Sequence, residues 1–86
     1  MSPEELLRQF EALAERVQIE VRYSALDGEG GLCRVRNRRV IVLNSRLSID
    51  EKVDVLARSL PREELEQMFI PPALRERIQQ ASRNDG

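Results

Sequence analysis

Apolar side chains recur along the chain with two different spacings, and the change of spacing separates the predicted elements. Over residues 3–17 they recur every three or four positions, which places them on one side of a helix. Ser2, followed by Pro3 and Glu5, is typical of a helix start, because the serine side chain can cap the first turn. Over residues 19–24 apolar and polar side chains alternate, as in a strand with one buried face. The chain therefore opens with an amphipathic helix and a strand.

The most apolar run of the chain is Val40–Leu43, and we expect it to be the central strand of a sheet. Residues 32–36 and 39–44 predict a hairpin with Asn37-Arg38 at its tip, because asparagine tolerates the left-handed backbone of a tight turn. Each face of this hairpin then carries alternate side chains. The face that we expect to lie under the helices consists of Cys33, Val35, Val40 and Val42.

The opposite face of the predicted hairpin is basic near the tip, where it carries Arg34, Arg36 and Arg39, and apolar farther down. The apolar part needs a cover, which either the C-terminal segment or another subunit would provide. It is therefore a candidate homodimer face, made of Leu32, Ile41 and Leu43.

Helical spacing returns after the hairpin. Ser48 and Glu51 form a capping box at the start of a helix. Pro61 should end this helix or start a new one, because proline removes a backbone donor. Residues 62–69 and the pair Leu74 and Ile78 then predict two short helices.

These elements predict a single α+β domain over residues 1–81, followed by a frayed tail over residues 82–86. We expect a small three-stranded antiparallel sheet packed against the N-terminal helix and the Ser48-capped helix, with two short C-terminal helices behind. A chain of 86 residues can build one modest core, so a second domain is excluded.

Charge and composition limit the classes of partner. The formal net charge is -1, from 14 basic and 15 acidic residues, so binding to nucleic acid or anionic lipid would need a local patch. No apolar stretch is long enough to cross a bilayer, and the N-terminus opens with an acidic amphipathic helix instead of a signal peptide. The single cysteine, Cys33, cannot form an internal disulfide. We therefore expect a cytoplasmic protein without membrane contact.

Few residues of the chain are candidates for catalysis or metal binding. The chain has no histidine and one cysteine, which excludes the ordinary zinc sites. Without a histidine base, Cys33 is better interpreted as a small core residue than as a nucleophile. The carboxylates of Glu63, Glu64 and Glu66 could act as an acid/base pair, but their place at a helix start after Pro61 has an ordinary helix-dipole explanation. We expect a protein that is not an enzyme and holds no metal or cofactor.

A cluster of arginines is the clearest charge feature. Residues 34–46 carry five of them and no acid, and the candidate basic patch consists of Arg34, Arg36, Arg38 and Arg39. A basic β-ribbon can follow a phosphate backbone, so nucleic-acid binding is the alternative function. The aromatic side chains on which single-strand binders stack bases are missing here, and acids such as Glu20 could instead pair with the arginines across the sheet.

Part of the chain resembles a known family. The matching residues are Ile41-Val42-Leu43-Asn44-Ser45, Leu47-Ser48, Glu51, Leu56-Ala57 and Leu60, preceded by Gly31-Leu32. They resemble the small bacterial zinc-peptidase-like domains of the ImmA/IrrE type, in which a strand ending in asparagine leads to a helix with a His-Glu-x-x-His zinc motif.

The resemblance implies a truncated relative without catalysis. In register, the zinc motif falls on residues 58–62, which read Arg-Ser-Leu-Pro-Arg and contain none of the three functional side chains. Arg58 and Arg62 would then lie on the groove side of the helix and could hold an anion or the carboxylate of a partner. The function that we expect is a non-enzymatic interaction module acting through protein-protein contacts, with a homodimer as one form of it.

Overall fold

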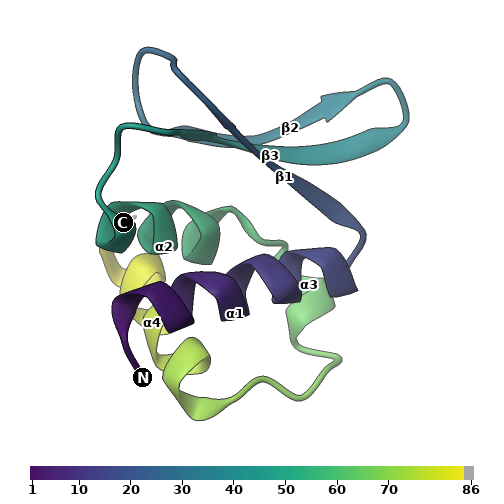
Figure 1. Cartoon of the computed structure of the whole chain (residues 1–86). Helices are drawn as coiled ribbons and strands as arrows, with labels where there is room; N and C mark the ends of the chain where they lie inside the picture. Colours follow the sequence, from purple (N-terminus) through teal and green to yellow (C-terminus); the bar gives the residue numbers. More distant parts are fainter. Residues whose placement is uncertain (85–86) are drawn as a thin grey trace.

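In the computed structural model, which describes residues 1–84, one three-stranded sheet lies on a layer of helices (Figure 1). The α+β prediction is confirmed. None of the helices within residues 1–84 has both the length and the apolar content to span a bilayer. In chain order the elements are α1 (Pro3–Arg16), β1 (Ile19–Ser24), β2 (Gly30–Val35), β3 (Arg38–Asn44), α2 (Ile49–Ser59), α3 (Arg62–Leu65) and α4 (Pro72–Asn84).

Both predicted helix starts are confirmed by their caps. Ser2 Oγ accepts a hydrogen bond from the backbone N–H of Glu5 at the start of α1. At α2 the box is complete, because Ser48 Oγ accepts from the Glu51 N–H while the Ser48 N–H donates to Glu51 Oε1 over 2.9 Å. The donation from the Ser48 backbone holds the pKa of Glu51 below its usual value. Each helix therefore begins where the sequence predicts.

The sheet has the strand order β1-β3-β2, so Val40–Leu43 does lie in the central strand, as predicted. The sheet is mixed, however, and the prediction of a purely antiparallel sheet is wrong. β2 pairs antiparallel with β3, whereas β1 pairs parallel with it. Residues 25–29 carry the chain past the end of β3 to its far side, and the Asn44 amide holds them there by donating to the carbonyl oxygens of Leu26 (3.1 Å) and Gly28 (2.8 Å).

The hairpin turn lies one position earlier than predicted. Arg36 and Asn37 form the turn, and Arg36, rather than Asn37, has the positive φ of 59°. Val35 therefore pairs with Arg38, and Cys33 pairs with Val40. The division of side chains between the two faces stays as predicted, since the pairing slips by two residues and the side-chain period is two.

The face that packs on the helices is the opposite of the predicted one. Ile41 and Leu43 are fully buried in the core, while Cys33 on the other face is exposed. On the side that packs on the helices, Ile41 lies beside Val21 of β1, so the apolar faces of the two strands form one surface toward the core. We call the helix-free side of the sheet, which carries Glu20, Arg22, Cys33, Val35, Arg38, Val40 and Val42, the open face.

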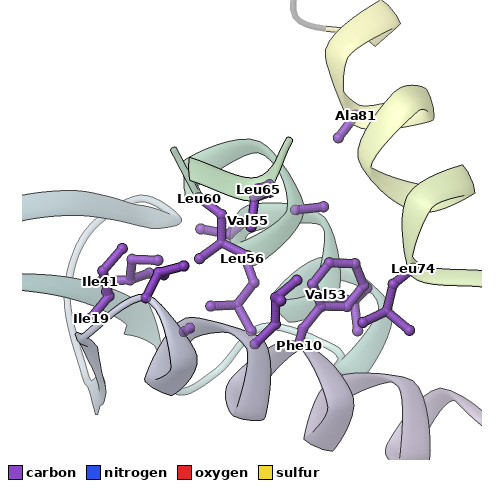
Figure 2. Packing of buried hydrophobic residues seen from close by; sticks show 14 of the residues in the cluster. Phe10, Ile19, Ile41, Val53, Val55, Leu56, Leu60, Leu65, Leu74 and Ala81 are labelled. Atoms are coloured by element: carbon purple, nitrogen blue, oxygen red, sulfur yellow. The ribbon is translucent and has the colours of Figure 1, made fainter. Parts of the chain in front are cut away.

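Helices α1, α2 and α4 share one core with the sheet. Figure 2 shows Phe10 of α1 directed toward Val53 of α2 and Leu74 of α4, and all three are buried. The last helix is longer than predicted, at 13 residues, because Ala81 is also buried in the core. Residues 82–84 of the expected tail belong to α4, and residues 85–86 lie outside the described part of the chain.

Candidate functional site

The predicted arginine patch does not form one surface. Arg39 lies on the helix side of the sheet, where Nη1 and Nη2 both donate to the carboxylate of Glu64 in α3, and Nη2 also donates to the carbonyl oxygen of Val17. The guanidinium holds the pKa of Glu64 below its usual value. Arg39 therefore joins three parts of the fold and has little capacity left for a ligand.

The other three arginines of the patch are exposed but point in different directions. Arg34 faces the helix side of β2, Arg36 lies in the turn, and Arg38 lies on the open face. Arg36 and Arg38 line one hollow together with Arg22 of β1, an arginine that the predicted patch did not include.

These three arginines surround a hollow on the open face, which we call the basic hollow. It is lined by Arg22, Val35, Arg36, Asn37, Arg38 and Val40. Val40 is fully buried although it faces away from the helices. The aliphatic parts of long arginine side chains can cover such a residue while their charged ends remain in water. The accessible apolar residue of the hollow is therefore Val35, which lies inside a cationic rim.

One acidic side chain, Glu20, reduces the net positive charge at the basic hollow. Glu20 accepts a hydrogen bond from Nε of Arg22, and this bond, with the charges of Arg22 and Arg38, lowers the pKa of Glu20. Glu20 therefore stays ionised at neutral pH beside the three guanidinium groups. The rim keeps a net positive charge, since one carboxylate faces three cations.

Aromatic side chains lie elsewhere. Tyr23 is on the helix side of β1, and its hydroxyl donates to the Glu11 carboxylate, so that burial and this bond raise the pKa of the phenol. Lys52 Nζ lies 5.3 Å from the centroid of the same ring. Phe10 is in the core, and Phe69 projects from the segment between α3 and α4. No aromatic residue therefore lines the basic hollow.

Arg58 and Arg62 do not form the joint contact that the family resemblance implied. The chain leaves α2 after Ser59, and Pro61 begins α3, so the two arginines stand on different helices. Arg58 pairs with Glu29 before β2. Arg62 lines a separate hollow between α3 and α4, together with Leu65, Glu66, Ile70, Arg75, Ile78, Gln79 and Ser82.

The predicted homodimer face is not a surface. Ile41 and Leu43 are fully buried beneath the helices, and only Leu32, at the edge of the sheet, is substantially exposed. The interpretation of Cys33 as a core residue is also wrong, because the thiol lies on the open face. Within residues 1–84, no group of three or more potential metal-ligating side chains lies together.

No protein-family model, curated protein or solved structure matches this chain. The geometry of the basic hollow is thus the main guide to function. Sequence reasoning missed the hollow because Arg22 joins it only through the parallel pairing of β1 with β3. The alternation of charged and apolar residues in β1 was visible, but not the strand beside which it lies.

Proposed function

We propose that the protein is a non-enzymatic interaction module that binds an acidic segment of another protein in the basic hollow. The observation that carries this proposal is the arrangement of three arginines around the exposed side chain of Val35, on a face that no helix within residues 1–84 covers. No nucleophile with a base stands beside it, since the lining side chains are arginines, valines and one asparagine.

The chemistry of the hollow fits a carboxylate-bearing peptide. A guanidinium group donates two parallel hydrogen bonds to a carboxylate, and such charge-assisted bonds are among the strongest in proteins. The exposed side chain of Val35 offers apolar contact to an aliphatic side chain next to the acid. The amide of Asn37 adds both a donor and an acceptor for the peptide backbone. A short segment that mixes acidic and aliphatic residues is therefore the ligand class that we propose.

Nucleic-acid binding is the second candidate. Arg34, Arg36 and Arg38 are exposed near the end of the hairpin, where a phosphate backbone could reach them. Proteins that bind single strands also stack bases on aromatic rings, and no such ring lines the hollow. This difference favours the acidic peptide.

We also propose that the chain is a degenerate cytoplasmic relative of the ImmA/IrrE-type domains. What supports this is the order of elements: a central strand ends at Asn44, a short loop follows, and a capped helix begins after Ser48. Arginine at positions 58 and 62 would then replace the zinc ligands, which is consistent with a protein that binds partners without catalysis.

A binding assay separates these functions. Fluorescence anisotropy would follow two labelled probes, a peptide of alternating glutamate and leucine and a single-stranded oligonucleotide, over a series of salt concentrations. We expect the wild type to bind the peptide, and Arg38→Glu to weaken binding by about tenfold or more, because a repulsive carboxylate replaces a charge-assisted bond. The matched control is Arg8→Glu, an exposed arginine on α1.

Three results would count against the peptide proposal. Binding of the oligonucleotide with a steep salt dependence, and no binding of the peptide, would establish the nucleic-acid alternative. An equal loss in Arg38→Glu and Arg8→Glu would show that net charge, and not the basic hollow, determines affinity. No binding of either probe by the folded protein would overturn the proposal.

A further inference from the structure

Strand β2 ends the sheet on the side opposite β1, and its outer edge is apolar and uncovered. Among residues 1–84, the only strand that pairs with β2 is β3. Two large apolar side chains on it are exposed, Leu32 at 44% and Val35 at 43%, and Cys33 between them is exposed as well. An edge strand with unpaired backbone groups and exposed apolar side chains is a template for another strand.

The two ends of β2 carry opposite charges. Asp27 and Glu29 precede the strand, and Glu29 also pairs with Arg58 of its own chain, whereas Arg34 and Arg36 stand at the end of the strand. A second β2 strand that lies alongside in the antiparallel direction would place its acidic start beside the basic end of the first strand. The same contact would form twice by symmetry, as in an isologous dimer. The charge pattern is thus complementary to itself.

We propose that two copies of this chain pair through their β2 edges, antiparallel, to form one continuous six-stranded sheet. This proposal concerns the outer edge of β2 and goes beyond the basic hollow. The two surfaces share Val35 and Arg36, whereas Arg22 and Arg38 of the hollow lie on β1 and β3. Helix α2 contacts β2 and β3 from below, so the two α2 helices would lie on the same side of the joined sheet.

The register follows from charge and from the extent of β2. For a twofold axis perpendicular to the sheet, the central residue pairs with its own copy. A centre at Arg34 would oppose two arginines. A centre at Leu32 would place Val35 opposite Glu29, which lies before the start of β2, so the exposed Val35 would have no strand residue opposite it. The remaining centre is Cys33.

A pairing centred on Cys33 also places each apolar side chain of β2 opposite a residue that can accommodate it. Val35 of each copy would lie opposite Gly31 of the other, where the space that a Cβ atom would occupy is open, with no atom within 4 Å. Leu32 would lie opposite the aliphatic stem of Arg34. Both strands therefore bury their exposed apolar residues without a clash.

The other edge of the sheet is less suited to this role. The aliphatic side chains of β1 pack against the core, and Ile19 is only 3% exposed. Tyr23 is 41% exposed, but its hydroxyl already donates to the Glu11 carboxylate of α1. The outward side chains of β1 on the open face are the charged residues Glu20 and Arg22, which pair with each other. An apolar surface that lacks a partner is found on β2 and not on β1.

Sedimentation equilibrium tests the dimer directly. We expect the wild type to form a species of twice the chain mass of 9.9 kDa, and the double variant Arg34→Glu/Arg36→Glu to self-associate about tenfold more weakly or worse. This variant has acidic residues at both ends of β2, whereas a second variant, Asp27→Arg/Glu29→Arg, has basic residues at both ends. Mixing the two variants should restore a dimer, because opposite charges then meet between the two chains. The hollow variant Arg38→Glu should dimerise as the wild type does, which separates this test from that of the proposed function.

Oxidative crosslinking tests the register. Directly opposite residues of antiparallel strands have Cβ atoms roughly 4.5–5.5 Å apart, close enough for a disulfide with a small adjustment. Copper-phenanthroline should therefore convert the wild type to a covalent dimer through Cys33. The control Cys33→Ser/Ser45→Cys, which moves the thiol to an exposed loop position, should crosslink much more slowly. A monomeric wild type, a dimer insensitive to the charge reversals, or equal crosslinking from both positions would overturn the proposal.

Discussion

Arg39 of β3 and Glu64 of α3 form an ion pair with two hydrogen bonds, and this pair joins the sheet to a helix of only four residues. The same guanidinium donates to the carbonyl oxygen of Val17, just after α1. A helix this short has almost no stability of its own. The position of α3 therefore depends on the ion pair and on the buried side chain of Leu65.

The first prediction concerns acid stability. The pKa of Glu64 is lowered by Arg39, so its ionised form stabilises the fold at any pH above the unfolded value near 4.5, and this contribution is lost as the pH falls toward the lower folded value. Glu64→Gln should thus be less stable than the wild type at pH 7, and the difference should be smaller at pH 3, below the unfolded pKa. Urea unfolding at both pH values measures the difference, and Glu63→Gln on the same helix serves as control. An equal loss at both pH values would contradict the ion-pair explanation.

A second prediction uses the two phenylalanines. Phe10 is fully buried between helices, whereas Phe69 is 76% exposed. Phe10→Ala should lower the free energy of unfolding by about 3–5 kcal/mol, because it removes buried surface and leaves a cavity. Phe69→Ala should change it by less than about 0.5 kcal/mol. Chemical denaturation followed by circular dichroism measures both, and similar losses for the two variants would contradict the assigned core.

The third prediction concerns two adjacent glycines. A Cβ atom on Gly30 would lie 1.9 Å from the carbonyl oxygen of Val42 in the neighbouring strand, and its φ of 108° disfavours any side chain. Gly30→Ala should therefore disrupt the pairing of β2 with β3. Gly31→Ala meets open space and is the matched control. Thermal melting should show a large loss for the first variant and little change for the second.

The fourth prediction tests the central strand. Ile41→Asp would bury a carboxylate without a partner and should cost about 4–5 kcal/mol, much of the total stability of a small domain. Val35→Asp changes an exposed residue on the neighbouring strand and should cost far less. Circular dichroism at room temperature should find the first variant largely unfolded and the second folded. A folded Ile41→Asp would place this residue outside the core.

Local signals in the sequence predicted the elements well. Ser2 predicted the start of α1, and Ser48 predicted the start of α2. Pro61 predicted the end of α2, and the run Val40–Leu43 predicted the central strand. Each of these signals depends on neighbours within a few residues, which a single sequence contains.

Long-range pairing was less predictable. β2 could pair with β1 or lie on the far side of β3. The choice depends on contacts such as the hydrogen bond from the Asn44 amide to the Leu26 carbonyl oxygen, which no local sequence pattern predicts. The face of the hairpin that packs on the helices, and so the burial of Ile41, depends on the apolar face of β1 beside it, and β1 is distant in the sequence. The basic hollow was missed for the same reason, since Arg22 reaches it from a strand far away in the sequence.

The central position of β3 also bears on the order in which the molecule folds. The β2-β3 hairpin closes over a turn of two residues, and such hairpins form in roughly microseconds. The β1-β3 ladder instead joins Ile19 to Arg39, so a much longer loop must close before any of its contacts form. We expect the hairpin to assemble early and β1 to dock late together with α1, which would leave one side of the central strand briefly open to pairing with other molecules during refolding.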